Sequence, residues 1–187
     1  FSWKNNSTHF DDDIGNWDVS GVTNMYSMFN GAYKFNKDIG NWNVRKVSNM
    51  NSMFDDAYKF NKDISNWVVS SVTDMSGMFA GAYKFNQDIG NWKIGKVTNM
   101  NRMFYNALAF NQNLNCWKVD PSKVNIDEMF TGSKIGIAKN DPISTLCWQY
   151  TMKGGNCSNC SKYICDGNTG KCFNSPNGPF NSLEQCK

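Results

Sequence analysis

The sequence has a single histidine, His9, among its 187 residues. A catalytic nucleophile, its base and an orienting group are dissimilar side chains that must converge, and one histidine leaves few ways to build such a set. Gly15, Gly40 and Gly90 recur in equivalent turns, so they do not form a phosphate-binding loop. We therefore predict no enzymatic activity, no catalytic residue and no cofactor.

Long hydrophobic runs are also missing. No stretch approaches the 18 or so residues of a membrane-spanning helix, so we expect no membrane span in this chain. The chain opens at Phe1 and carries no signal peptide, which favours a mature or excised product with any anchor outside it. The net charge is +3 with no basic cluster, which argues against a DNA or RNA partner.

The dominant feature is a repeat of 25 residues, visible first in five tryptophans: Trp17, Trp42, Trp67, Trp92 and Trp117. The first copy reads IGNWDVSGVTNMYSMFNGAYKFNKD. Copies occupy residues 14–38, 39–63, 64–88 and 89–113, an atypical copy fills 114–135, and half a copy fills 1–13. A fixed period of this length predicts a solenoid, because each unit buries its apolar face only by stacking on its neighbours.

Two periodicities alternate within a repeat. Met25, Met28, Phe29 and Ala32 have helical spacing, with Thr23 or Asn24 as the capping residue, and this predicts a short helical or 3₁₀ segment. Between Phe35 and Val47 the apolar residues, which include Ile39, Trp42 and Val44, are separated by polar residues and glycine, and this predicts a short extended strand entered and left through turns. We expect an α/β solenoid like a leucine-rich repeat over residues 1–135, with a parallel strand ladder on one side and helical segments on the other.

The repeated pattern F-N-x-D-I-x-N-W-x-V-S-x-V-T-x-M-x-x-M-F-x-x-A-x-x-F-N resembles the repeat of BspA-like leucine-rich surface proteins. That family includes the mycoplasma lipoprotein repeat catalogued as a domain of unknown function. The resemblance covers Phe10 to Phe130, about two-thirds of the chain. It implies a surface-exposed or secreted protein of adhesion or structural type, without enzymatic activity in the repeat.

Columns of identical side chains run through the repeats. The Met, Phe and Trp columns are predicted to form the core. Asparagine columns are expected to hydrogen-bond along the solenoid and to satisfy turn backbone; they are Asn36, Asn61, Asn86 and Asn111, and Asn16, Asn41, Asn66 and Asn91. The aspartates, with Asp38, Asp63 and Asp88 as the positions of interest, are weak calcium candidates, since lysines four residues upstream could neutralise them. No metal site is otherwise expected.

The best candidate for a binding surface is a stripe of six side chains: Tyr33, Tyr58, Tyr83, Lys34, Lys59 and Lys84. Tyrosine offers a flat apolar body with a polar tip, which suits a sugar or a protein partner, and the lysines could attract polyanions. The competing interpretation is that each tyrosine only covers the end of its helical segment.

Residues 136–187 are predicted to form a small, irregular cysteine-rich module. The seven cysteines are Cys116, Cys147, Cys157, Cys160, Cys165, Cys172 and Cys186. This density in a segment poor in core residues indicates disulfides and an oxidising compartment, whereas zinc would need a second short cysteine pair or histidine. Seven cannot all pair, and Cys116 either bonds Cys147 or is a free thiol. Four glycosylation sequons agree with secretion: Asn5, Asn6, Asn156 and Asn159.

The half repeat at residues 1–13 starts the solenoid in mid-coil, and an open solenoid end invites another subunit. We therefore expect an extracellular or cell-surface structural or adhesion protein that stacks head to tail as a homo-oligomer, forming a filament or coat. The alternative is a monomeric module that binds a glycan or a host or cell-surface protein through the Tyr–Lys stripe.

Overall fold

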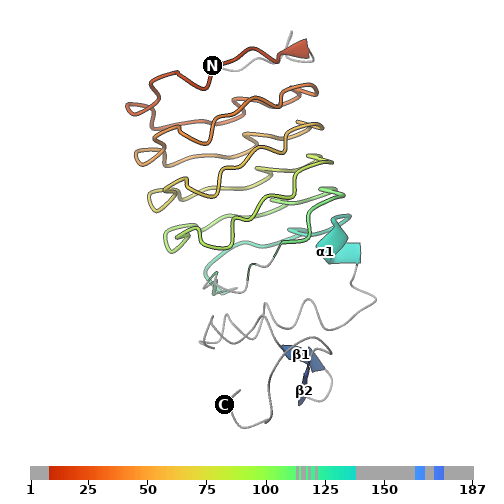
Figure 1. The fold of residues 1–187 in the computed structure, drawn as a ribbon. Coiled ribbons are helices and arrows are strands. Elements are labelled where there is room, and N and C mark those ends of the chain that lie inside the picture. Colours follow the sequence, from red (N-terminus) through yellow and green to blue (C-terminus); the bar gives the residue numbers. More distant parts are fainter. Residues whose placement is uncertain are drawn as a thin grey trace.

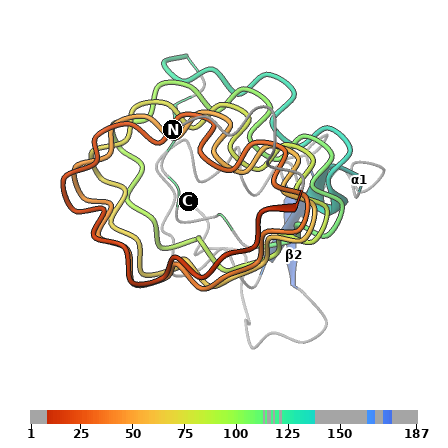
Figure 2. The ribbon, with the colours of Figure 1, turned by 90° about the horizontal axis from the view of Figure 1, so that it is seen from above.

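The computed structural model describes residues 9–112, 114, 117, 119–120, 122–137, 163–166 and 171–174. The repeats form a stack of coils, one coil per 25 residues, and the outlines of the coils nearly superimpose along the stack (Figures 1 and 2). The assigned elements are a short helix, α1 (Lys134–Ile137), and two strands, β1 (Tyr163–Asp166) and β2 (Lys171–Asn174). The strands pair antiparallel, with Cys165 opposite Cys172 in the register of the backbone. No helix in these described segments is long and apolar enough to cross a membrane.

Stacked aromatic rings fill the interior of the coils. Phe54 lies 5.4 Å from Phe29 and 5.5 Å from Phe79 between ring centroids, and all three are at most 1% exposed. A second phenylalanine column packs against the first, with Phe60 only 4.0 Å from Phe54. Because one coil alone would leave these rings in water, stacking is what buries them. The predicted repeat solenoid is therefore confirmed.

The tryptophan column ties each coil to the one before it. The indole Nε1–H of Trp42 donates to the Ile14 carbonyl oxygen at 3.1 Å, and Trp67 donates to Ile39 at the same distance. Trp92 and Trp117 repeat the bond to Ile64 and Ile89. An indole N–H buried in a core needs a partner, so this bond explains why tryptophan recurs at this position.

The predicted helical segment is not a helix. Ser27 and Gly31 have φ values of 52° and 70°, in the left-handed region, which an α-helix cannot include. The segment instead forms successive turns, such as the bond from the Met28 N–H to the Met25 carbonyl at 3.3 Å. Met25, Phe29 and Ala32 still point inward and are at most 2% exposed, so turns with a three-residue step reproduce helical spacing of the core.

This turn segment also carries the backbone ladder that was predicted for residues 35–47. The N–H groups of Met25, Ser27, Phe29 and Gly31 all donate to carbonyls of the next coil, at 2.8–2.9 Å. Parallel bridges join equivalent residues, Asn24 to Asn49 and onward through Asn125. A flat strand would send alternate N–H groups to opposite neighbours, whereas here left-handed residues four positions apart, Ser27 and Gly31, interrupt the extended backbone, and all four N–H groups point to the same neighbour. Across the predicted strand, Trp42 and Val47 instead close turns onto Ile39 and Val44.

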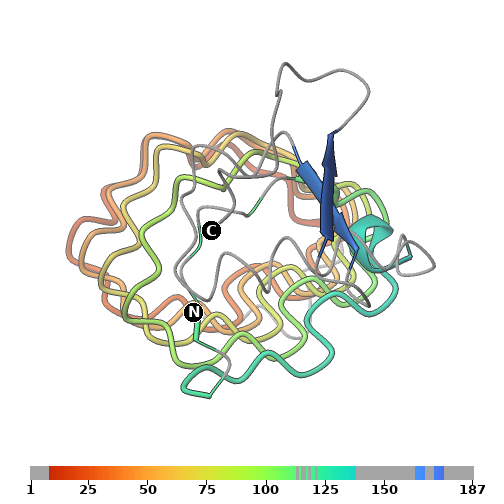
Figure 3. The same ribbon diagram turned by 90° about the horizontal axis from the view of Figure 1, so that it is seen from below.

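The two ends of the solenoid differ in burial. Trp17 in the first coil is 48% exposed, whereas Trp117 in the fifth coil is 0% exposed and Phe130 is 9% exposed. Trp117 and Phe130 of the fifth coil are thus covered, while Val124 and Ile126 of the same coil are half-buried. The fifth coil, which contains an inserted turn, extends beyond the outline of the others on one side when seen along the stack (Figure 3).

Candidate functional site

The three tyrosines of the Tyr–Lys stripe form a continuous stack along the solenoid. The ring of Tyr58 lies 4.5 Å from those of Tyr33 and Tyr83, with interplanar angles of 11° and 7°. Tyr33 is 36% and Tyr83 is 38% exposed, and Leu108, 51% exposed, takes the same position in the fourth coil. Both faces of Tyr58 are covered by neighbouring rings, so Tyr58 presents only its edge to solvent, while Tyr33 and Tyr83 each have one face covered by Tyr58.

Backbone hydrogen bonds hold the stripe in place. The Tyr58 N–H donates to the Asp56 carbonyl at 2.9 Å, and the Tyr58 carbonyl accepts the N–H of Lys84 at 3.2 Å. The same bond recurs one coil on, from Ala109 to Tyr83. Asp56 has a φ of 57°, which turns the chain sharply just before the tyrosine. Hydrogen bonds within the coil and to the next coil therefore fix the backbone that carries the tyrosines.

The hydroxyl of Tyr58 remains protonated over the whole physiological range. Burial between the neighbouring rings raises the pKa of Tyr58 to about 12, and the Asp56 carboxylate and the hydroxyls of Tyr83 and Tyr33 add to the effect. A protonated phenol is both a donor and an acceptor. The edge of the stripe can therefore donate hydrogen bonds to an anionic or carbonyl oxygen.

The lysines of the stripe are exposed and have no acidic partner in the part of the chain that the structure describes. The ion pairs found there are Lys37–Asp11 at 3.1 Å, Arg102–Glu128 at 2.5 Å and Lys123–Asp120 at 3.3 Å. Direct pairing of Lys34, Lys59 and Lys84 with the aspartate column is therefore not observed. Their charges face solvent.

The aspartate column closes turns. The N–H of Gly40 donates to the Asp38 carboxylate at 2.9 Å, and Ser65 and Gly90 make the same bond to Asp63 and Asp88 at 2.9 and 3.0 Å. The backbone N–H and the hydroxyl of Ser65 lower the pKa of Asp63. Within the described ranges, no three acidic, histidine or cysteine side chains gather to hold a metal. These contacts give the calcium candidates a structural role.

The asparagines after the phenylalanine column form the predicted hydrogen-bonded ladder. The Asn36 side-chain oxygen accepts the Asn61 N–H at 3.0 Å, and Asn61 and Asn86 accept from the next coil at 2.9 Å. The other predicted column is exposed, and no hydrogen bond of its side chains is found within the described residues; it comprises Asn16, Asn41, Asn66 and Asn91. Only the first column ties coils together.

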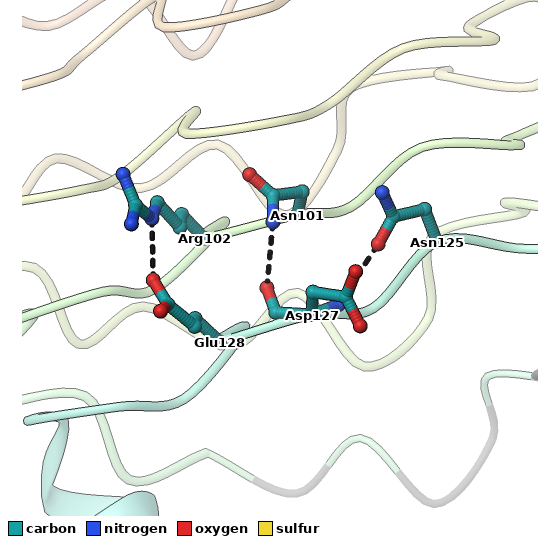
Figure 4. Close-up of polar contacts among 5 residues, drawn as sticks. All are labelled: Asn101, Arg102, Asn125, Asp127 and Glu128. Carbon is teal, nitrogen blue, oxygen red and sulfur yellow. Dashed lines mark hydrogen bonds and ion pairs between the residues drawn. The ribbon is translucent and has the colours of Figure 1, made fainter.

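Polar contacts join the turn segments of the fourth and fifth coils (Figure 4). The Asn101 side-chain nitrogen donates to the Asp127 carbonyl at 3.0 Å, and Arg102 pairs with Glu128. Because the fifth coil has one inserted residue, the partners in these contacts are 26 residues apart in the sequence, whereas equivalent positions of the other neighbouring coils are 25 apart. The Asn125 side chain accepts the Asp127 N–H at 3.0 Å and closes the turn.

A cavity of about 230 Å³ opens beside the inserted turn of the fifth coil. Its lining is mainly apolar and also includes two lysines and one aspartate. The lining residues are Ile94, Gly95, Lys96, Val97, Thr98, Met100, Val119, Asp120, Lys123 and Val124.

An acidic pair in the second coil is absent from the predictions. Asp55 and Asp56 are both half-buried, and burial raises the pKa of Asp55 to about 6, with the neighbouring Asp56 charge adding to the rise. The Asn30 side chain donates to Asp55 at 3.1 Å, which opposes that rise. The sequence does contain a signal for this pair, because the column to which Asp55 belongs has a different residue in each coil: Asn30, Asp55, Ala80 and Tyr105.

Several predicted site residues lie outside the described residues: Cys116, Cys147, Cys157, Cys160, Cys186, Asn5, Asn6, Asn156 and Asn159. For Cys165 and Cys172 the structure describes only their facing backbone positions in β1 and β2. Disulfide pairing and glycosylation therefore stay predictions.

Comparison with known proteins places the repeat in a family. The family model described as "Mycoplasma protein of unknown function, DUF285" matches residues 3–72 and 43–143, which together span well over half of the chain. No curated protein matches the chain, and no solved structure matches it. Both matches run through the stacked coils with their tryptophan and phenylalanine columns. The chain belongs to the DUF285 family.

Proposed function

We propose that this protein is a non-enzymatic extracellular structural or adhesion protein that binds its partner through the Tyr–Lys stripe. The observation that carries the proposal is the combination of three exposed lysines without acidic partners and a fixed stack of tyrosines beside them. A rigid frame lowers the entropy lost on binding, since the contacting side chains are already in place. The resemblance to BspA-like surface proteins supports the adhesion role and the surface location.

Burial at the two ends favours stripe binding over filament formation. Head-to-tail stacking needs two open faces, and Trp17 provides an exposed apolar surface at the first coil. The fifth coil supports such a contact less well, because Trp117 and Phe130 are already covered there. Binding through the side of the solenoid leaves both ends as they are.

Glycan and protein arrays probed with the intact chain test the stripe. Replacing Tyr58 and Tyr83 by alanine should abolish the strongest signals. Tyr26, which is 48% exposed and lies outside the stripe, supplies the matched control as Tyr26→Ala. Loss of binding in the control alone, or unchanged binding without Tyr58 and Tyr83, would count against the stripe. Melting curves of all variants separate binding effects from unfolding.

Filament or coat assembly remains the second proposal, and Trp17 is the residue that favours it. Sedimentation velocity at rising concentration, under non-reducing conditions, distinguishes the two. Head-to-tail stacking predicts a growing series of oligomers that Trp17→Gln shortens, since a polar side chain there removes apolar contact area. A single monomer boundary at high concentration excludes assembly through the ends.

A further inference from the structure

We propose that the Tyr–Lys stripe takes a linear acidic polysaccharide whose chain lies along the solenoid axis. This inference rests on the proposed function and names its ligand class. It follows from three properties of the stripe: which parts of the tyrosine rings are accessible, how the lysine charges are spaced, and where the nearest carboxylates lie.

The accessible parts of the rings argue against stacking ligands. Neutral sugars and nucleic-acid bases both use open aromatic faces, and stacking supplies much of the affinity for single strands. Here the rings stack on each other at 4.5 Å, so both faces of Tyr58 and one face each of Tyr33 and Tyr83 are occupied, and Tyr58 meets solvent only at its edge. A ligand must therefore be recognised by hydrogen bonds and charge. Sulfate or carboxylate oxygens accept hydrogen bonds from protonated phenols and from ammonium groups.

The lysines act together on such a ligand. Each of the three coils contributes one tyrosine and one lysine to the stripe, and the centroids of neighbouring tyrosine rings are 4.5 Å apart. Each lysine follows its tyrosine in the sequence, so neighbouring lysines are about one such step apart; this is shorter than the screening length of about 8 Å at physiological ionic strength, and neighbouring charges reinforce one another. A small anion contacts one lysine, whereas a polymer with repeated negative groups contacts all three. Its linked contacts then gain from effective concentration.

The nearest carboxylates restrict where the polymer can lie. Asp38, Asp63 and Asp88 follow the lysine column and are held by their own turns, so they repel an anion on that side. Two further carboxylates act on the stripe: Asp56, whose charge acts on Tyr58, and Asp11, which pairs with Lys37 and whose pKa the Lys59 charge helps to lower. The polymer therefore lies over the tyrosine edges, and Asp56 weakens its binding.

Binding of the intact chain to heparin, alginate, neutral dextran and a single-stranded oligo-dT tests the inference by isothermal titration. We expect heparin or alginate to bind and to weaken with added salt, while dextran and oligo-dT do not bind. The triple variant Lys34→Gln, Lys59→Gln and Lys84→Gln should lower the affinity for the acidic polymer by about tenfold or more. The matching triple arginine variant should retain binding, since it keeps the charges.

Two further variants make the test specific. A control variant removes three exposed lysines outside the stripe: Lys46→Gln, Lys93→Gln and Lys96→Gln. Lys46 and Lys96 follow Lys34 and Lys84 by 12 residues, about half a coil, so the control changes net charge equally and should change affinity less than about twofold. Asp56→Asn should tighten binding, by about twofold to fivefold, because it removes the opposing charge. Asn106 holds the same left-handed position in the fourth coil, so asparagine fits there.

The outcomes separate this inference from the proposed function. Equal losses in the stripe and control variants, or no binding of either acidic polymer, overturn the ligand class. The ligand class is also overturned if dextran, oligo-dT or a protein binds through the stripe and the acidic polymers do not. In that case the proposal that the stripe binds a partner still stands. If no ligand of any kind depends on the stripe, both proposals fail.

Discussion

Replacing Asp55 by asparagine should stabilise the protein at neutral pH and leave it unchanged in acid. Asp55 is a half-buried carboxyl group beside Asp56, and burial raises its pKa from 3.8 to about 6. The folded state thus binds the proton more tightly than the unfolded state. Stability from this group is present below pH 4 and is lost as the pH rises through 6. Asparagine removes the charge, and Asn30 holds the equivalent place in the first coil.

The size of the effect follows from the pKa. One pKa unit corresponds to about 1.4 kcal/mol, so the rise to about 6 would cost the ionised form about 3 kcal/mol in full. Asp55 is only half-buried, and solvent screening reduces this to about 1–2 kcal/mol. The Asn30 side chain, 3.1 Å from the Asp55 carboxylate, can still donate to an amide oxygen. Asp55→Asn should therefore gain about 1–2 kcal/mol above pH 7 and nothing below pH 4.

Urea denaturation followed by tryptophan fluorescence between pH 4 and 8 measures this gain. Asp63→Asn is the control of opposite sign, because hydrogen bonds from Ser65 lower the pKa of Asp63 and its ionised form stabilises the fold. That variant should lose stability at neutral pH. An equal shift for Asp55→Asn at pH 4 and pH 7 would refute the electrostatic explanation, since a packing effect does not depend on pH.

Three further changes probe the ladders. Trp67→Phe removes the indole bond to Ile39 and should lower the urea midpoint by an amount equal to about 2 kcal/mol; no change would show that the bond is dispensable. Phe79→Ala empties a fully buried ring position and should cost about 3–5 kcal/mol, seen as a lower melting temperature by circular dichroism. Gly81→Ala should cost about 2 kcal/mol in calorimetry, because φ is +64° and the new Cβ would collide with the Asp56 carboxylate; a smaller loss contradicts the close contact.

The sequence predicts the solenoid and its core because each buried column has one residue type that meets one physical need. Tryptophan recurs because its indole N–H must reach a carbonyl of the preceding coil. Asn36 and Asn61 recur because each side chain accepts a backbone N–H of the next coil. Such requirements are local and identical in every coil, so they leave a period that can be read without a structure.

The local conformation could not be predicted from the same pattern. Met25, Phe29 and Ala32 have the spacing of one helix face, yet successive turns with a three-residue step bury the same residues. The decisive information is the sign of φ at Ser27 and Gly31, and serine at a left-handed position gives no compositional warning. Gly77 at the equivalent position of the third coil was the available signal, since glycine there permits φ of +60°.

The stripe was predicted as a binding surface, but the stacking of its rings was not predicted. Its members were found from repetition alone, whereas the covering of each ring face by the next ring depends on how closely the coils stack. That distance changes the expected ligand from one that stacks to one that accepts hydrogen bonds. The acidic pair at Asp55 and Asp56 was missed for the opposite reason, because it occurs in one coil and leaves no period.

Some of the repeated columns make contacts that stabilise the fold, and others make none. Asp38 and Asp63 recur because they close turns, and folding accounts for them. Lys34, Lys59 and Lys84 recur at exposed positions where no ion pair or side-chain hydrogen bond holds them within the described part of the chain. Three like charges in one column also repel one another, so folding gains nothing from their identity. The column Asn16, Asn41, Asn66 and Asn91 also recurs at exposed positions without a side-chain hydrogen bond among the described residues, so repetition alone does not mark a binding site. The lysine column differs from it in its charge, and we propose that repeated positive charge selects a partner with repeated negative charge.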